Sequence, residues 1–444
     1  MAIAENLALG APVEGNASRA LISVATIAVV ASALLIYDSQ AFMVAEIFGV
    51  KRESQALLII PIAVAAAHYF VSSPARLLNP LIGFCIVKLA TEIALRGQWS
   101  YILDSLAAIF ALTVLICAPA KSFEAGAKFV VAIAAILALM ALVQWVVLAM
   151  YPELIKYILV VSDEGALEKT VEHPVALLGI MSEQQFSFLG QPLGRMQSFA
   201  KEPSLNVIYF MLPATLGFLL KSRSAFLLGS TILAFCVLSL SGSVFLTLAF
   251  TAVWWVLLTV TSIRFAMPFG MLILMGAFLF VVDYFGLEPL LNGIAYIAQY
   301  GDFLTKTVSL TDRSAGAVAN MGAALASPLG SATVSDIPGP WLVNSALAAG
   351  WLGVLMLLWF LRRLGYQLDI FYSKSPLLSA GRFGSLLLVG VLATIIVFND
   401  YQMGNYSGLI LLAFIYRAIE LRNRVGRVEP PCIEPMGQRN LWIV

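Results

Sequence analysis

The chain has 444 residues, of which 61% are apolar and only 11% are Asp, Glu, Lys or Arg. Soluble globular proteins carry roughly 25% charged residues, so a soluble fold of this size would lack the polar side chains to cover its surface. The net charge of +1 gives no basic excess for binding nucleic acid. Two histidines and four cysteines, without a C-x-x-C pair, predict neither a metal site nor another cofactor. With a mean hydropathy of +0.92, the composition predicts a polytopic membrane protein and excludes a disulfide scaffold, a disordered chain and a secreted enzyme.

Twelve apolar stretches approach the roughly 20 residues that a membrane-spanning helix needs. They are 20–37, 55–71, 77–95, 100–118, 127–150, 204–220, 224–240, 243–262, 266–285, 341–361, 383–399 and 405–421. The short gaps between 77–95 and 100–118, and between 224–240 and 243–262, predict tight helical hairpins. The expected fold class is therefore an all-α polytopic membrane protein with about twelve transmembrane helices.

Basic residues orient the helices, because Lys and Arg concentrate in cytoplasmic loops. If the N-terminus is cytoplasmic, most basic residues fall on that side, and the short outer loops hold only Lys51, Arg52 and Arg96. Both termini are then cytoplasmic, as an even number of spans requires. The first span has no clear cleavage site after it, so we expect a retained signal anchor. Residues 1–421 form a single membrane domain, and 422–444 form a cytoplasmic tail.

Two outer loops are long, at about 151–203 and 286–340. Long ordered loops are usually functional, and neither loop is long enough to build a separate core. We expect both to cap the helix bundle. Their apolar runs, Val175–Met181 and Leu290–Ala298, predict short helices on the membrane surface.

The first long loop ends with charges at the outer boundary of the next span. Arg195, Lys201 and Glu202 precede Pro203, which suits the first turn of a helix. The N-terminus of that helix carries partial positive charge, so together with the two basic side chains it suits a lipid-linked phosphate. The alternative is that these basic residues only snorkel at the end of a span.

The second long loop contains one arginine, Arg313, and ends near Asp336. A guanidinium can grip a diphosphate with two parallel hydrogen bonds, so Arg195 and Arg313 from the two loops could clamp such a group. The alternative is that Arg313 is simply solvated.

Few charges lie inside the spans, and each is a candidate for function. Lys88 and Glu92 are four residues apart in the third span, where they could pair with each other or line a polar cavity. Asp400 and Tyr401 follow the eleventh span, where the carboxylate could face a cavity or belong to a loop.

Four patterns between about 190 and 360 resemble the O-antigen polymerase/ligase superfamily (the Wzy and WaaL families). Arg195–Ser204 resembles the family's Arg-x-x-(Gly/Ser)-Phe-x-x-Glu-Pro-Ser segment, and Ser239–Ser243 resembles its Ser-rich hairpin. Arg313 with Ser327–Gly330 resembles the "Arg … Pro-Leu-x-Gly" stretch. Asn344 with Gly350–Gly353 resembles the "His-Asn … Gly-x-x-Gly" opening of the next span.

The resemblance implies a GT-C-like glycosyltransferase bundle that acts at the periplasmic face of the bacterial inner membrane, without a metal, on an undecaprenyl-diphosphate-linked glycan. Arg195 and Arg313 would hold the donor diphosphate, and Glu202 is the first candidate for the base that activates the acceptor. The further residues expected to contact substrate are Lys201, Asp336, Asn344, Asp400 and Tyr401, of which Asp336 and Asp400 are alternative bases.

Val343 stands where ligases carry a histidine, and this favours a polymerase over a ligase that transfers glycan to lipid A-core or protein. A polytopic secondary transporter is a further alternative, although no two-fold repeat is visible. A relative of the peptidoglycan polymerases fits the loop pattern less well. Besides membrane lipid, a chain-length co-polymerase and a flippase are partners that a polymerase allows.

Overall fold

The structure is a computed structural model that describes most of the chain. The described residues are 16–47, 53–74, 78–97, 99–151, 156–162, 169–176, 179–180, 185–188, 191–194, 207–239, 241–258, 261–285, 320–331, 340–376, 379–398 and 406–425.

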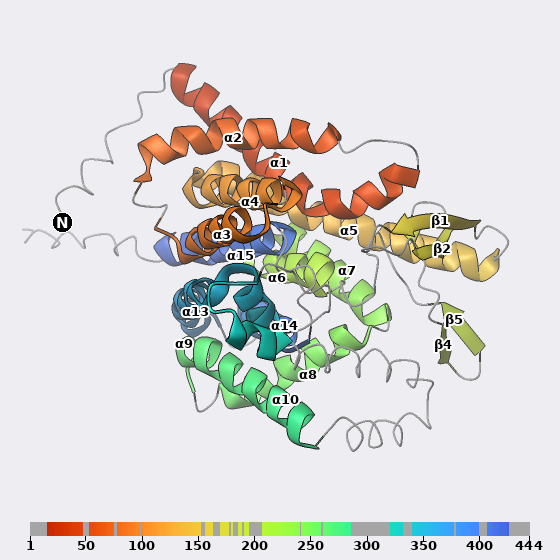
Figure 1. The fold of residues 1–444 in the computed structure, drawn as a ribbon. Coiled ribbons are helices and arrows are strands. Elements are labelled where there is room, and N and C mark those ends of the chain that lie inside the picture. The colour runs from red at the N-terminus through yellow and green to blue at the C-terminus, as the bar shows by residue number, and fades with distance from the viewer. Residues whose placement is uncertain are drawn as a thin grey trace, which may run out of the picture.

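The described residues of each of the twelve predicted apolar segments are largely helical (Figure 1). The helices are α1 (Asn16–Ile47), α2 (Glu53–Ser72), α3 (Pro80–Thr91), α4 (Trp99–Cys117), α5 (Ala120–Met150), α6 (Leu212–Leu219), α7 (Arg223–Leu238), α8 (Gly242–Leu257), α9 (Ile263–Phe265), α10 (Met271–Phe285), α13 (Trp341–Lys374), α14 (Ala380–Phe398) and α15 (Tyr406–Val425). Short π-helices continue or precede three of them: η3 (Glu92–Arg96), η6 (Val207–Met211) and η7 (Ala266–Gly270). The prediction of a helical bundle is therefore confirmed, and α15 extends the last helix into the predicted tail.

Within the described residues, length and hydropathy identify two helices that could each cross a membrane, Ala120–Val147 within α5 and the whole of α13. A third span would result if α7 and α8 are counted together, and several shorter apolar helices accompany them. These apolar helices indicate a helical, membrane-embedded protein. That all twelve helices cross the membrane stays a prediction.

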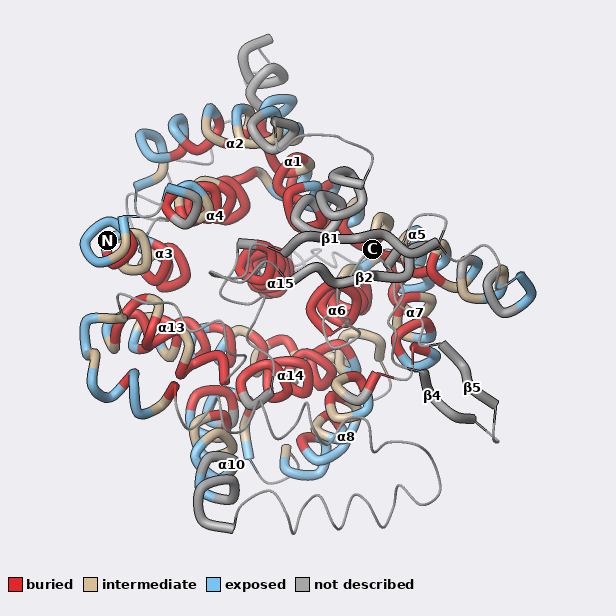
Figure 2. The backbone as a smooth tube through the Cα atoms, turned by 45° about the vertical axis from the view of Figure 1, so that its right-hand side comes forward, coloured by how far each residue is buried: buried red, intermediate tan, exposed pale blue. Residues whose placement is uncertain are grey.

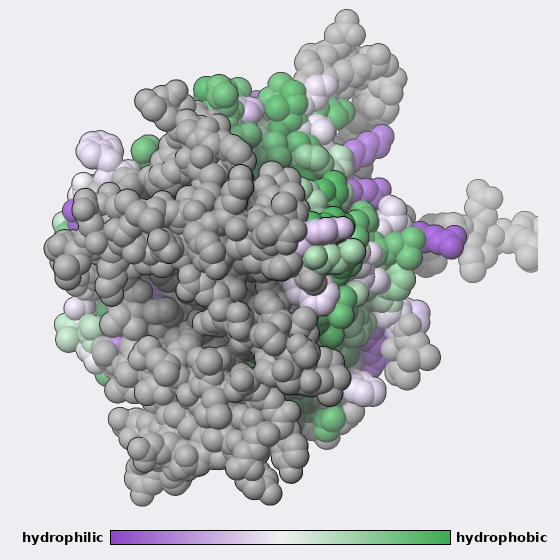
Figure 3. Space-filling view, turned by 90° about the vertical axis from the view of Figure 1, so that its right-hand side faces the viewer, coloured by the Kyte–Doolittle hydropathy of each residue, from purple (hydrophilic) through white to green (hydrophobic). Residues whose placement is uncertain are grey.

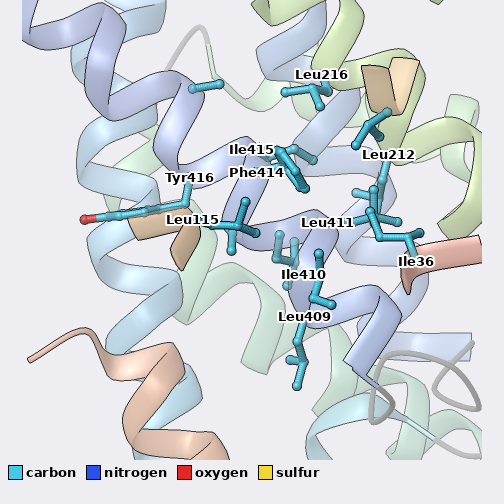
Figure 4. Packing of buried hydrophobic residues seen from close by; sticks show 14 of the residues in the cluster. Ile36, Leu115, Leu212, Leu216, Leu409, Ile410, Leu411, Phe414, Ile415 and Tyr416 are labelled. Carbon is cyan, nitrogen blue, oxygen red and sulfur yellow. The ribbon is translucent and has the colours of Figure 1, made fainter. Parts of the chain in front are cut away.

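Three helices form the centre of the bundle. Residues 212–219 of α6, 384–396 of α14 and 407–419 of α15 are buried on every side (Figure 2). Figure 4 shows side chains of α15 packed among Leu115 of α4, Ile36 of α1 and Leu212 of α6. A helix that is apolar all round belongs inside a bundle, so these helices support the others.

The surrounding helices turn apolar side chains outward. On α2, Leu57, Ile60 and Val64 follow helical spacing and are all more than half exposed. Green, hydrophobic atoms also cover much of the described surface in Figure 3. Such an apolar stripe is unfavourable in water and natural against lipid tails.

Three hydrogen bonds join helix ends that the sequence predicts near the cytoplasmic side. Thr26 of α1 bonds Ser122 of α5, with an Oγ1–Oγ distance of 2.9 Å. Arg417 of α15 donates to the carbonyl of Ala118, just after α4, at 3.3 Å. Asn423 of α15 donates to Gln367 of α13. Each bond joins two chain segments that the predicted topology places near the same side, and which side of a membrane they face belongs to the proposal below.

The two predicted hairpins differ. Helices α3 and α4 pack against each other, as a tight hairpin requires. Helices α7 and α8 are joined by a short break but bend by 117°. The prediction of a tight hairpin there is wrong, because α8 packs mainly against α14 rather than against α7.

Five short strands lie in the described part of the first long loop. β1 (Lys156–Ser162), β2 (Lys169–Ala176) and β3 (Gly179–Ile180) form one antiparallel sheet, and β4 (Gln185–Phe188) pairs with β5 (Gln191–Gly194). The predicted surface helix at Val175–Met181 is wrong, because Val175 pairs with Ile180 and Ala176 pairs with Gly179 in a sheet. Segments rich in β-branched and aromatic residues favour a pleated sheet, and β1 has this composition. The second predicted surface helix, Leu290–Ala298, lies outside the described residues.

Candidate functional site

Of the predicted site residues, the structure describes Asn344, which lies half-buried in the first turns of α13. The others lie outside the described residues: Arg195, Lys201, Glu202, Arg313, Asp336, Asp400 and Tyr401. Two of the motifs, 327–330 and 350–353, are described, and they meet at the end of the bundle opposite to the Arg417 contacts.

Helix α13 is broken at Gly350, where φ is +65° and ψ is 179°. Only glycine adopts this backbone conformation without strain, since a side chain would collide with its own backbone. The break interrupts the helical hydrogen bonds, so backbone groups on both sides need other partners. In an apolar environment, each unsatisfied group would cost several kcal/mol.

A turn at 327–331 fills this break. The amide of Trp351 donates to the carbonyl of Pro328 at 3.0 Å, and the amide of Ser331 donates to the carbonyl of Leu347 at 2.8 Å. The turn therefore bonds to α13 both before and after Gly350. Gly330 has a φ of +105°, and a Cβ atom there would lie 2.8 Å from Cγ2 of Thr91 in α3. The Pro-Leu-Gly turn fits between α3 and the broken helix because it lacks that atom.

Arg96 fixes the turn from the other side. Its Nε donates to the carbonyl of Ser331 at 3.0 Å, and its Nη2 donates to the carbonyl of Leu347 at 2.9 Å. Its Nη1 pairs with Oε1 of Glu92, and the two side chains are only 2% and 1% exposed. Both residues lie on η3, and a π-helix of this kind is frequent at functional sites. One guanidinium thus connects α3, the second long loop and α13.

Asn344 is held by the same loop. Nδ2 of Asn320 donates to Oδ1 of Asn344 at 2.9 Å. Nε1 of Trp351 donates to the carbonyl of Ala324 at 3.2 Å. The segment 320–331, with its short helix at 320–326, therefore docks on α13 at three places. We call this assembly of η3, 320–331 and 341–353 the loop dock.

The sequence pattern predicts no site role for Arg96, which it places as a charge in a short outer loop. The sequence predicts that Glu92 pairs with Lys88 or lines a polar cavity, and the structure gives Glu92 an ion pair with Arg96. The available signal was the spacing of four residues between Glu92 and Arg96. Burial of the pair could not be read from that spacing.

The Ser-rich segment between α7 and α8 has a local role in the structure. Oγ of Ser239 donates to the carbonyl of Cys236 at 2.6 Å, and both residues are buried. Within α8, Oγ1 of Thr247 donates to Oγ1 of Thr394 in α14 at 2.9 Å. These contacts end α7 and join α8 to α14, so they support the bundle.

Replacing Gly350 with alanine is expected to destabilise the loop dock. The left-handed conformation costs about 1–3 kcal/mol for a residue with a side chain. The new Cβ would also lie 2.8 Å from the backbone of Pro328 and Leu329. Thermal unfolding in detergent measures the effect.

Gly322→Ala is the matched control for this substitution. Gly322 lies in the same docked segment, in a helix, and a Cβ there has nothing within 4 Å. It should leave the melting temperature unchanged or raise it slightly, because alanine favours helix over glycine. Equal melting temperatures for the two variants would contradict the role of the break.

No family model matches the chain, and no curated protein or solved structure is detectably similar to it. Within the described residues, no group of three or more His, Cys, Asp or Glu side chains could hold a metal ion.

Proposed function

We propose that the chain is a polysaccharide polymerase, a glycosyltransferase that joins undecaprenyl-diphosphate-linked repeat units at the periplasmic face of the bacterial inner membrane. The observation that carries the proposal is the loop dock. Two motifs that the sequence separates, Ser327–Gly330 and Gly350–Gly353, bond directly to each other, and Asn320 of the same docked segment bonds Asn344. A bundle with this rigid outer end can position the loop that carries Arg313.

In the proposed reaction, a hydroxyl at the non-reducing end of the acceptor glycan attacks the anomeric carbon of the donor. The bond from that carbon to the diphosphate oxygen breaks, and undecaprenyl diphosphate leaves. Arg195 and Arg313, with Lys201 beside them, stabilise the negative charge that develops on the leaving group. Glu202 takes the proton from the acceptor hydroxyl, with Asp336 and Asp400 as alternative bases. Attack from the opposite face inverts the anomeric centre.

The orientation completes the proposal. The Arg417 end of the bundle faces the cytoplasm together with both termini, and the loop dock faces the periplasm. The basic residues gathered at the first end support this assignment. Cleavage of the sugar–diphosphate bond supplies the driving force, so the reaction needs neither ATP nor a metal.

A transporter is the second candidate, because transporters use broken helices such as α13 to bind ions and substrates. In those proteins the carbonyls at the break coordinate the ion. Here the carbonyl of Leu347 accepts hydrogen bonds from both Arg96 and Ser331, and the carbonyl of Pro328 accepts one from Trp351. The backbone carbonyls at the break therefore already accept hydrogen bonds from the protein, which favours a structural role for the break over ion binding.

A reconstituted assay tests the proposal. The purified protein receives an undecaprenyl-diphosphate glycan as its sole substrate, and the lipid-linked products are separated by gel and weighed by mass spectrometry. A ladder at multiples of the repeat unit is expected. Glycan transfer that occurs only after lipid A-core or a protein acceptor is added would identify the protein as a ligase instead. Glycan uptake into vesicles without any transfer would replace it by a transporter.

A further inference from the structure

At the end of the bundle opposite the loop dock, two arginines lie over neighbouring aromatic rings. Cζ of Arg382, at the start of α14, lies 4.2 Å from the ring centroid of Tyr372. Cζ of Arg422, near the end of α15, lies 5.7 Å from the ring centroid of Phe371. Both rings belong to the last turns of α13, so three helices bring two guanidinium groups onto consecutive residues of α13.

Phe371 holds these helix ends together. A Cβ atom on Gly381 would lie 2.9 Å from Cζ of Phe371, so the start of α14 touches the ring that Arg422 also covers. Lys374 is exposed on the same last turn of α13 and adds a third positive charge. We call Phe371, Tyr372, Lys374, Arg382 and Arg422 the arginine–aromatic cluster.

Nearby carboxylates are already engaged with other groups. Asp369 accepts a hydrogen bond from the first amide of α9 at 3.1 Å, and Glu420 bonds two other arginines of α15. Glu124 is the acidic neighbour of Arg422, but its own ion pair is with Lys128 at 2.8 Å. Among the ion pairs between described residues, none includes Arg382 or Arg422. The cluster therefore presents a net positive charge to an outside anion.

We propose that the arginine–aromatic cluster binds the phosphate of an anionic phospholipid headgroup. A guanidinium that lies on an aromatic ring loses little further freedom on binding and presents its N–H edges to phosphate oxygens. Aromatic residues at the ends of membrane helices lie at the level of the headgroups, so the anion is available there as lipid. This site is separate from the proposed donor site and does not depend on glycosyltransferase activity.

Native mass spectrometry of the full chain tests the proposal. The protein is released from mixed vesicles of phosphatidylglycerol and phosphatidylcholine, and the lipids that remain bound are identified. The wild type is expected to retain phosphatidylglycerol selectively. Arg382→Ala combined with Arg422→Ala should reduce this retention by about an order of magnitude or more, since each basic side chain near anionic lipid contributes about a fivefold factor.

The matched control removes two other basic residues from the same end of the bundle, Lys221→Ala with Arg223→Ala. Both side chains are exposed, and the ring of Phe218 near them contacts Phe383 at the start of α14 at 5.1 Å. This control should retain lipid as the wild type does. Tyr372→Leu keeps every charge but removes one ring, and it should bind at an intermediate level.

Three outcomes would overturn the site. In the first, the Arg382/Arg422 double variant retains as much phosphatidylglycerol as the wild type. In the second, the control variant loses as much lipid as the double variant. In the third, the wild type retains phosphatidylcholine as well as phosphatidylglycerol. Displacement of the lipid by millimolar inorganic phosphate would also overturn it, because the ligand would then be a free anion. Unfolding temperatures in lipid-free detergent show that each variant is folded before its lipids are compared.

Discussion

Replacing Arg96 with alanine is expected to lower the free energy of unfolding in detergent by about 3–5 kcal/mol, because removal of one partner of a buried ion pair leaves the other charge uncompensated. Glu92 would remain at 1% exposure without its cation. The carbonyls of Ser331 and Leu347 would each lose a hydrogen bond. The same substitution should loosen the segment 320–331, which protease sensitivity of the intact protein would show.

Two comparisons separate this effect from a general loss of charge. Lys128 forms an ion pair with Glu124 at the same spacing of four residues, but the side chains are 45% and 56% exposed. Lys128→Ala should therefore cost less than about 1 kcal/mol. Adding Glu92→Ala to Arg96→Ala should recover part of the loss, since no unpaired buried charge remains. If Arg96→Ala costs no more than Lys128→Ala, the pair does not hold the loop dock.

The helices were predictable because hydropathy is a local property. An apolar run of about 20 residues without charge becomes a helix in lipid wherever it stands in the bundle. The topology that the basic residues predict stays a prediction.

The arrangement of those helices was not predictable from composition. α2 and α15 both read as apolar spans, yet α2 exposes Leu57 while residues 407–419 of α15 are buried on all sides. Apolar side chains suit both lipid and protein interior, so hydropathy does not distinguish them. The angle between α7 and α8 depends likewise on α14, a helix that is distant in the sequence.

The contacts of the loop dock at the candidate site were likewise not predictable from the local sequence. The resemblance singled out Ser327–Gly330 and Gly350–Gly353, but a glycine in a helical pattern can equally serve close packing. The break at Gly350 exists because a turn about 20 residues earlier supplies its hydrogen bonds. Arg96, from a loop far away in the sequence, completes the arrangement. Contacts of this range leave no local pattern.

Arg195→Ala and Arg313→Ala are each expected to abolish polymer formation while the protein still inserts and folds. If both guanidinium groups hold the donor diphosphate, each substitution removes a positive charge that stabilises the transition state. Losses of roughly a hundredfold or more in rate are typical of such a removal. The measurement is the product ladder of the reconstituted assay, with unfolding temperature recorded for each variant. Arg223→Ala, at the other end of the bundle, is the matched control and should polymerise normally.

Arg195→Lys and Arg313→Lys distinguish a forked grip from simple charge. Lysine keeps the positive charge but cannot form two parallel hydrogen bonds to a phosphate, so both variants should remain poor enzymes. Full activity of the lysine variants would show that the two arginines act only by general electrostatic attraction. Wild-type ladders from the alanine variants would contradict any role of Arg195 and Arg313 in holding the diphosphate.

Arg313 precedes the docked segment 320–331 by a few residues, so Arg96→Ala should weaken polymerisation in the same assay. If the Arg96 variant is destabilised but still polymerises at the wild-type rate, the loop dock has no role in catalysis. That result would leave the proposed role of Arg195 and Arg313 unaffected.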